Sequence, residues 1–254
     1  MPAKPPKQRL DLLLVERGLA ESRQKAQALL LAGEVRVNGQ RHEKPGERIS
    51  TDAAIEITGT KPRYASRGGF KLEGALADFS VNPAGKICLD VGSSTGGFTD
   101  CLLQHGAAHI FAVDVTPDQM AWNLQQDPRV TRIRANAREL TREHITAAAP
   151  AGVSTEPNLV TLDLAFIATA KVLGAAVAAA APAAEFLILV KPQFELDRGD
   201  IGKGGIVRDP LLHDRAIERV RVAAIAAGLR IEGVRASRLP GAEGNQEFFI
   251  YAHA

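Results

Sequence analysis

From residue 70 onward, short apolar runs alternate with segments of helical periodicity, and no other feature of the chain constrains its fold as strongly. Strand-like runs occur at 86–91, 109–115, 129–133, 158–164, 185–190 and 247–253. Helices are predicted at 70–79, at 97–104, after Pro117, as a long alanine-rich helix before 185, and at 209–228. Parallel strands need crossover connections of this length, which helices supply. The alternation therefore predicts an α/β fold with an open, mostly parallel sheet and helices on both faces.

The first sixty residues follow a different pattern, which predicts a small α+β domain. A helical stripe at 10–19 is followed by a second helix, with Ser22 placed to cap it and Gly33 placed to end it. An alternating run then turns at 38–39, an Asn-Gly pair typical of a β-hairpin. We predict domains at 1–60 and 68–254, joined by a linker at 61–67 that is rich in basic and small residues.

Charge is distributed unevenly along the chain. Residues 1–71 carry 14 Lys/Arg against 8 Asp/Glu, a net charge of +6, whereas residues 72–254 carry 17 against 21, a net charge of −4. A basic front domain favours contact with a polyanion such as RNA, although a well-solvated small domain is the alternative. The residues we expect to hold RNA phosphates are Arg9, Arg23, Lys25, Lys44 and Arg67.

Cysteine usage and hydropathy bear on the compartment. The only cysteines, Cys88 and Cys101, fall in a predicted strand and a predicted helix, which favours a reducing environment over a disulfide scaffold. The N-terminus lacks the apolar core of a signal peptide, and the apolar stretch at 172–184 is too short to span a bilayer. We expect a cytoplasmic protein without a membrane partner. His105 and His109 lack further ligands at metal spacing, so no metal is expected.

The loop after the first strand of the sheet indicates which ligand the fold holds. In CLDVGSSTGGFTD, at 88–100, an acid precedes a glycine-rich turn. Ser94 stands where a dinucleotide loop needs its second glycine, and the turn ends in Gly-Gly-Phe where a P-loop needs Gly-Lys-Ser/Thr. Asp114 ends the next strand, 24 residues after Asp90 in the sequence. An acid at about this sequence spacing can accept hydrogen bonds from ribose hydroxyls. S-adenosylmethionine, which carries a sulfonium and a ribose but no phosphate, fits this pattern; a merely tight strand-to-helix turn is the alternative.

Candidate catalytic groups lie at predicted strand ends, where open α/β sheets bind ligands. Asp163 and Lys191 end two strands, and Glu247 begins the last one. Lys71 lies in the helix before the sheet. Methyl transfer to an alcohol needs in-line geometry and a group that takes the proton, and a neutral lysine held near carboxylates can do this. For each residue taken singly, a solvated boundary position is the alternative.

Several segments together resemble the TlyA family of ribosomal RNA 2′-O-methyltransferases, also known historically as haemolysins. They are RLDLLLVERGLAESRQKAQALLLAGEVRVNG, YASRGGFKLEGAL, DVGSSTGGFTD, LVKPQFE, GKGGIVRD and GNQEFF. The resemblance covers nearly the whole chain. It implies a Rossmann-like methyltransferase domain with a mostly parallel seven-stranded sheet, similar to FtsJ/RrmJ, preceded by an RNA-binding domain of the ribosomal protein S-four type.

The resemblance also implies the activity and its residues. Lys71, Asp163, Lys191 and Glu247 would form a Lys-Asp-Lys-Glu catalytic set that methylates a cytidine 2′-hydroxyl in ribosomal RNA, as free RNA or in ribosomal subunits. In this set Lys191 would act as base with Asp163 close by, and Lys71 and Glu247 would orient them. The residues we expect around S-adenosylmethionine are Asp90, Gly92, Ser93, Gly96, Gly97, Phe98, Asp114, Val115, Asn136 and Ala137.

Other functions fit the sequence less well. The segment RLD at 9–11 resembles the catalytic motif of pseudouridine synthases, but it lies in the first turn of a helix in the small domain, where Arg9 can meet a phosphate. An oxidoreductase needs a pyrophosphate loop, which Ser94 interrupts. A non-catalytic RNA-binding protein or a membrane-active haemolysin is the remaining alternative, and a pore would need spanning segments that the sequence lacks.

Overall fold

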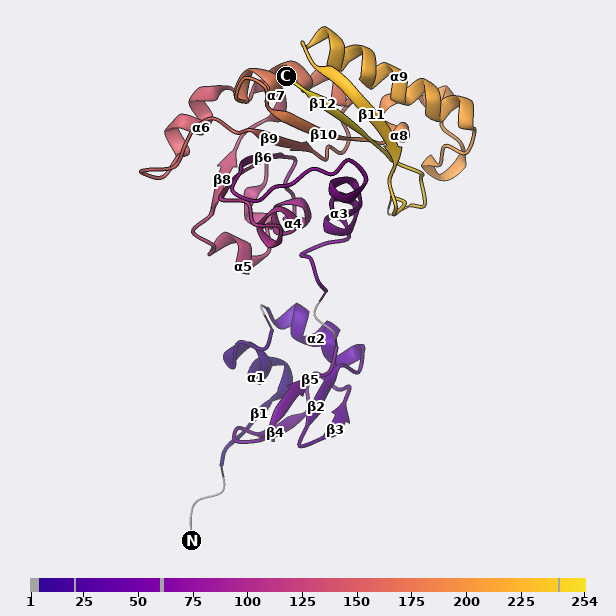
Figure 1. The fold of residues 1–254 in the computed structure, drawn as a ribbon. Helices are drawn as coiled ribbons and strands as arrows, with labels where there is room; N and C mark the ends of the chain where they lie inside the picture. The colour runs from indigo at the N-terminus through magenta and orange to yellow at the C-terminus, as the bar shows by residue number, and fades with distance from the viewer. Residues whose placement is uncertain (1–4, 21, 60–61, 242) are drawn as a thin grey trace. The chain divides into compact units, whose positions relative to one another are not determined.

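The computed structural model describes residues 5–20, 22–59, 62–241 and 243–254 (Figure 1). The chain divides into two compact units, Met1–Arg63 and Tyr64–Ala254, and each is described by itself. The last residue of the predicted first domain, 60, and the first of the predicted linker, 61, lie outside the described residues. Residues 64–67 of this linker belong to the second unit: Tyr64 is buried, and the amide of Ala65 donates a hydrogen bond of 2.8 Å to Asp100 Oδ2.

The first unit is the small α+β domain that the sequence predicts. Its elements are β1 (Lys7–Arg9), α1 (Leu10–Glu16), α2 (Arg23–Leu31), β2 (Val35–Val37), β3 (Gln40–His42), β4 (Arg48–Ser50) and β5 (Ile55–Ile57). Ser22 caps α2 by accepting from the amide of Lys25, as predicted. Strands β2 and β3 form the predicted hairpin, with positive φ at Asn38 and Gly39. Leu10 and Leu14 of α1 and Leu30 of α2 are buried against the strands in one small core.

A seven-stranded sheet organises the second unit and confirms the predicted mostly parallel α/β fold. The strand order is β11-β12-β10-β9-β6-β7-β8, and only the pairings of β12 are antiparallel. The strands are β6 (Ile87–Val91), β7 (His109–Asp114), β8 (Val130–Arg134), β9 (Leu159–Leu162), β10 (Glu185–Val190), β11 (Arg230–Ala236) and β12 (Phe248–His253). The inner strands are buried on both faces, as expected of a sheet covered by helices.

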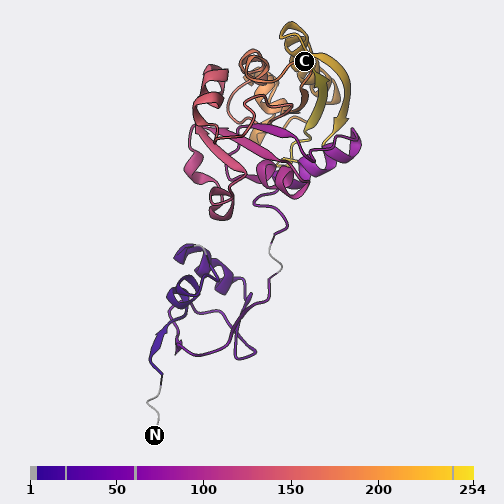
Figure 2. The same ribbon diagram turned by 60° about the vertical axis from the view of Figure 1, so that its left-hand side comes forward.

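Helices cover both faces of this sheet, as predicted (Figure 1). One layer holds α3 (Gly68–Asp78), α4 (Gly97–Gln104) and α5 (Trp122–Gln125), whose apolar side chains form one core cluster. The other holds α6 (Arg142–Ala148), α7 (Leu173–Ala179) and α9 (Pro210–Ala226), with the short α8 (Pro192–Glu195) after β10. Figure 2 shows α3 alongside the β11–β12 hairpin, where Arg238 forms an ion pair of 2.5 Å with Asp78.

Two elements differ from the sequence-based expectation. The alanine-rich helix is short, because α7 ends at Ala179 and Ala180 is extended, two residues before Pro182. Proline cannot continue a helix and restricts the residue before it. Strand β11 was not predicted from periodicity, because it is an edge strand without clear alternation of buried and exposed residues. Within the part of the chain that the structure describes, no helix is long and apolar enough to cross a membrane.

The strand order reverses at β6, which lies between β7 and β9. The chain runs outward from β6 through β7 to β8, and then returns to the other side of β6 as β9. In open α/β sheets such a reversal leaves a crevice at the carboxyl ends of the two central strands, and ligands bind there. The topology therefore places the candidate site where β6 and β9 end, at the predicted glycine turn and beside Asp163.

Candidate active site

The glycine turn approaches the end of β9 too closely for a side chain. Gly92 follows β6 directly and has a φ of +88°, and a Cβ built there would lie 2.3 Å from the backbone oxygen of Asp163. A Cβ on Gly97, the first residue of α4, would lie 2.1 Å from Ser66 Oγ. Glycine at these positions therefore lets three segments converge: the turn, the residues before α3 and the end of β9.

A substitution at Gly92 tests this convergence. We expect Gly92→Ala to reduce methyl transfer at least about a hundredfold, because the new methyl group must displace the Asp163 backbone by about an ångström. Gly174→Ala is a matched control, since a Cβ there meets nothing within 4 Å. Initial rates with a saturating methyl donor compare the two variants. A Gly92→Ala enzyme as fast as the Gly174→Ala control would show that the close approach is dispensable.

Asp90 lies beneath the turn, where it is fully buried. Its Oδ2 accepts from Thr99 Oγ1 at 2.6 Å and its Oδ1 from Thr161 Oγ1 at 3.1 Å, so the carboxyl group links β6 to α4 and β9. Burial raises the pKa of Asp90 to about 7, against the opposing effect of the two threonine hydroxyls. The structure thus places this residue, predicted to contact the cofactor, as a support below the turn.

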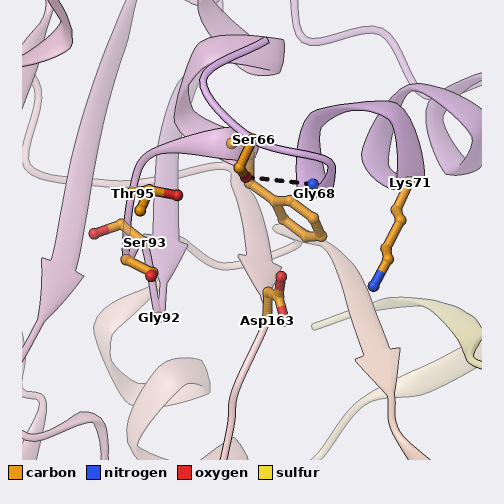
Figure 3. A pocket seen from close by; sticks show the side chains of 10 residues that line it. Ser66, Gly68, Lys71, Gly92, Ser93, Thr95 and Asp163 are labelled. Atoms are coloured by element: carbon orange, nitrogen blue, oxygen red, sulfur yellow. Dashed lines mark hydrogen bonds between the residues drawn. The ribbon is translucent and has the colours of Figure 1, made fainter. Parts of the chain in front are cut away.

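A cavity of about 130 Å³ opens above the turn (Figure 3). It is lined by Ser66, Gly68, Lys71, Gly92, Ser93, Ser94, Thr95, Gly97, Phe98 and Asp163. In the close view Asp163 lies between the Gly92–Thr95 turn and Lys71. The Ser93 side chain is buried, and its hydroxyl has no hydrogen-bond partner among the described residues. A buried hydroxyl without a partner is costly, so this group is available to a ligand in the cavity.

Lys191 and Asp163 form the first of two lysine–carboxylate pairs. Asp163 follows β9 and Lys191 follows β10, the adjacent parallel strand, so both side chains start from the same edge of the sheet. Lys191 Nζ lies 2.5 Å from Asp163 Oδ1, and the side chains remain 14% and 22% exposed. The contact is an ion pair rather than an aligned hydrogen bond. Lys191 Nζ also lies 5.9 Å from the centre of the Phe194 ring.

The second pair is more deeply buried. Lys71 lies on α3 and Glu247 immediately precedes β12, and Lys71 Nζ donates to Glu247 Oε2 at 2.5 Å. The Glu247 side chain is 2% exposed and the Lys71 side chain 10%. Lys71 and Asp163 line the same cavity, so the structure brings all four residues of the predicted catalytic set to one place.

The outer cofactor residues predicted from the sequence follow the next two strands. Asp114 ends β7 and accepts from the Ser94 amide at 2.9 Å and the Thr116 amide at 2.8 Å, which connects it to the glycine turn. Val115 beside it is exposed. Asn136, next to Ala137, follows the edge strand β8 and caps a 3₁₀ turn by accepting from the Arg138 amide. These four residues lie outside the lining of the cavity, on the side of the turn toward β7 and β8.

The basic residues predicted to hold RNA are exposed and belong to both units. Arg9, Arg23, Lys25 and Lys44 lie on the first unit, and Arg67 lies at the start of α3 on the second. Arg9 and Arg23 both contact a buried acid, Asp11, which the sequence singled out only as part of RLD.

Two residues of the cavity lining outside the glycine turn were missed from the sequence. Ser66 falls in the predicted linker, and Gly68 is the first residue of the predicted second domain. Their signal was the run of small residues at the start of α3, which permits close packing against Gly97.

Phe166 is an exposed aromatic residue near the end of β9. It is 92% exposed, has a φ of +64°, and packs against Phe194 with ring centres 5.5 Å apart. A phenylalanine that is both this exposed and in the left-handed region is uncommon.

Comparisons with known proteins agree with this geometry. Residues 64–254 match the FtsJ-like methyltransferase family, and residues 8–55 match the S4 domain. TlyA of Mycobacterium tuberculosis, a 16S/23S rRNA (cytidine-2′-O)-methyltransferase, is 46% identical over 245 residues, which cover 96% of this chain and 88% of TlyA. YqxC of Bacillus subtilis, a proposed rRNA methyltransferase, is 44% identical over 248 residues, 97% of this chain and 86% of YqxC.

A solved structure of a proposed hemolysin from Streptococcus thermophilus resembles the whole chain. The TM-score is 0.71 at 38% identity, and the match covers 99% of this chain and 89% of that one. These matches confirm the resemblance on which the predicted fold and activity were based. With an S4 domain followed by an FtsJ-like domain, the chain belongs to the TlyA family of FtsJ-like methyltransferases.

Proposed function

We propose that this protein transfers a methyl group from S-adenosylmethionine to a ribose 2′-hydroxyl of ribosomal RNA, with cytidine as the target nucleoside. The observation that carries the proposal is the pair of lysine–carboxylate contacts around one cavity beside the glycine turn. Family membership supports the reaction class, and the name of the mycobacterial relative supports the nucleoside. Because ribosomal RNA is its substrate, we infer that the protein acts in the cytoplasm.

The residues around the turn fit S-adenosylmethionine, which supplies an electrophilic methyl group when bound. The unpartnered Ser93 hydroxyl can accept from the ammonium or donate to the carboxylate of the methionine part. The Asp114 carboxylate, half-exposed at the end of β7, can accept from ribose hydroxyls. Gly97 and Phe98 line the cavity, whereas Gly96, where a Cβ would lie 2.4 Å from Leu124 Cδ1, lets the turn pack closely on α5.

Lys191 is the group placed to receive the proton. In the proposed reaction the 2′-oxygen forms a bond to the methyl carbon as the bond from that carbon to the sulfonium sulfur breaks, which leaves the sulfur neutral. Lys191 first gives up one proton of its ion pair to solvent, and the amine at Nζ then accepts the hydroxyl proton. Asp163 holds this amine at the edge of the sheet. Lys71, which is fixed by the buried Glu247, lines the same cavity as Asp163 and can donate to a ribose oxygen. The four side chains thereby orient the hydroxyl toward the methyl donor.

The exposed Phe166 extends the site toward the target nucleoside. Phe166 packs on Phe194, and Phe194 lies under the Lys191 amine, so the two rings lead from solvent to the proposed base. An exposed aromatic face can stack on a nucleobase turned out of its helix. We infer that Phe166 receives the target base, while the basic residues Arg9, Arg23, Lys25, Lys44 and Arg67 hold the RNA backbone.

Transfer to ribosomal RNA is the direct test. The protein is incubated with S-adenosylmethionine labelled in its methyl group and with ribosomal RNA or ribosomal subunits from cells that lack this enzyme. We expect label in nucleotides whose 3′ linkage resists alkaline hydrolysis, the mark of a methylated 2′-oxygen, and we expect these to map to cytidine. Label confined to base-methylated nucleosides, or absent from RNA, would contradict the proposal.

Asp114 provides a test of the cofactor assignment. We expect Asp114→Ala to weaken binding of S-adenosylmethionine about tenfold, because a charge-assisted hydrogen bond to the ribose is lost. Titration calorimetry measures the affinity. Asp118→Ala, an exposed acid whose ion pairs are with Arg132 and Arg134, is a matched control and should bind normally. Equal affinity in both variants would remove the ribose role of Asp114.

A further inference from the structure

The first unit contains a buried acid that the proposed transfer reaction does not use. Asp11 lies in the first turn of α1, and its side chain is 0% exposed. Its carboxylate accepts four hydrogen bonds, two from Arg9 and one each from Arg23 and Gln27. The Arg9 hydrogen bonds hold the pKa of Asp11 well below its usual range, so the carboxylate stays charged at every physiological pH.

The geometry of these hydrogen bonds aligns two guanidinium groups. Arg9 donates through Nε at 3.0 Å and Nη2 at 2.9 Å, and Arg23 donates through Nε at 3.0 Å. Arg9 Nη2 and Arg23 Nε share Oδ2, so these nitrogens lie at most about 6 Å apart. Within the described residues, Arg9 Nη1 and both Nη atoms of Arg23 have no hydrogen-bond partner, and both side chains are about half exposed.

We propose that Arg9 and Arg23 form one binding site for a single RNA phosphodiester, and that Asp11 is the positioning residue that aims both at it. This inference rests on the proposed binding of RNA by the first unit. Two guanidinium groups fixed side by side present forks of N–H donors that match phosphate oxygens. The Asp11 amide also donates to the Pro45 oxygen at 3.1 Å, which holds the adjoining Lys44 next to the same helix start.

Whether Asp11→Asn weakens or strengthens RNA binding distinguishes a positioning role of Asp11 from a purely electrostatic one. Asp11→Asn removes one negative charge from a basic surface, so long-range attraction alone would strengthen RNA binding and steepen its salt dependence. Asparagine, however, has no charge, and the NH2 group that replaces one carboxylate oxygen cannot accept the Arg9 Nε hydrogen bond, so it holds the two guanidinium groups much more weakly. We therefore expect Asp11→Asn to weaken RNA binding about tenfold and to reduce the salt slope by about one, as if one phosphate contact were lost.

The experiment measures binding of the full chain to a fluorescein-labelled RNA hairpin over a series of salt concentrations. Glu56→Gln, at an exposed position of strand β5, is the matched control because it removes one negative charge without touching Arg9 or Arg23. We expect the control to bind as tightly as the parent protein or slightly more tightly. Binding by Asp11→Asn as tight as by Glu56→Gln would overturn the proposal.

A double-mutant background shows whether Asp11 acts through the arginines. In the Arg9→Ala/Arg23→Ala protein, adding Asp11→Asn should cause no further loss of RNA affinity. A further tenfold loss in that background would mean that Asp11 serves the fold and would contradict the proposal. If thermal melting shows that Asp11→Asn unfolds the first unit, Arg9→Lys/Arg23→Lys takes its place: it keeps both charges but loses the forks. Full affinity in this lysine variant would equally overturn the proposal.

Steady-state kinetics keep this inference separate from the proposed function. We expect Asp11→Asn to raise the KM for RNA with kcat unchanged, because the catalytic groups lie on the second unit. A parent protein that transfers no methyl group to RNA would contradict the proposed function. A parent protein that transfers normally, paired with an Asp11→Asn variant of unchanged KM, would contradict only the phosphate site.

Discussion

Replacing Lys191 with alanine is expected to lower methyl transfer to RNA by at least a factor of about 100, with binding of S-adenosylmethionine unchanged. The amine lies 2.5 Å from Asp163 at the edge of the cavity, and among the residues that the structure describes Lys71 is the other lysine that contacts a carboxylate there. Lys71 is held by the buried Glu247 and cannot take over, so the variant has no group placed to receive the hydroxyl proton. Single-turnover assays measure the rate, and calorimetry measures cofactor affinity.

Lys171→Ala is the matched control, because Lys171 is an exposed lysine on the same unit, in the segment before α7. It removes the same charge and the same number of atoms without touching the cavity lining. We expect it to transfer at the rate of the parent protein. Near-normal transfer by Lys191→Ala would show that another group receives the proton and would refute the proposed role of Lys191.

Breaking the buried pair Lys71–Glu247 by removing one partner should strongly destabilise the second unit. Either Lys71→Met or Glu247→Gln leaves a charge without its partner at a site that is almost fully buried, which typically costs about 3–5 kcal/mol of unfolding free energy. The double variant removes both charges, and we expect it to recover most of that loss. Neither single variant nor the double variant should transfer methyl groups. Urea unfolding followed by far-ultraviolet circular dichroism measures the loss of stability, because α3 to α9 all lie on this unit.

An exposed ion pair supplies the comparison. Arg221 and Glu218 on α9 lie 2.6 Å apart with both side chains about half exposed. Arg221→Met should cost no more than about 1 kcal/mol, because solvent screens exposed pairs. If Lys71→Met were no more destabilising than Arg221→Met, the pair would not be held as a desolvated unit. Recovery of stability without recovery of transfer in the double variant would separate folding from catalysis.

Much of the second unit follows from local sequence, because its strands and helices carry their own periodicity. Helix α4 at Gly97–Gln104 and strand β10 at Glu185–Val190 were predicted at their observed bounds. Strand β11 was missed because it lies at the edge of the sheet, where its side chains are exposed or only partly buried. Such a strand needs no regular alternation of apolar residues. Helix α7 is short because Pro182 cannot continue it. The sequence-based prediction gave more weight to the helix-forming alanines than to this proline.

The chemistry of the site was predictable in kind but not in arrangement. A lysine or an acid at a strand end looks the same in sequence whether it is solvated or paired. The separation of Lys71 and Glu247 along the chain gives no local pattern that links them, and only the packing of α3 beside β12 forms their ion pair. In the same way, Asp90 has the sequence signature of a ligand contact, but its complete burial between Thr99 and Thr161 makes it a support for the turn.

By itself, the sequence determined the α/β alternation, the basic front domain, the glycine turn and the identities of the reactive side chains, because each depends on residues close together in the chain. The tertiary structure alone decided which side chains meet: the two lysine–carboxylate pairs around one cavity, the exposed Phe166 leading to Lys191, and the two arginines joined by Asp11. The physical reason is that most of these contacts bring together residues distant in sequence; the contact of Arg9 with Asp11, two residues away, is the exception. Strand order and helix packing set such distances, and both depend on the whole core.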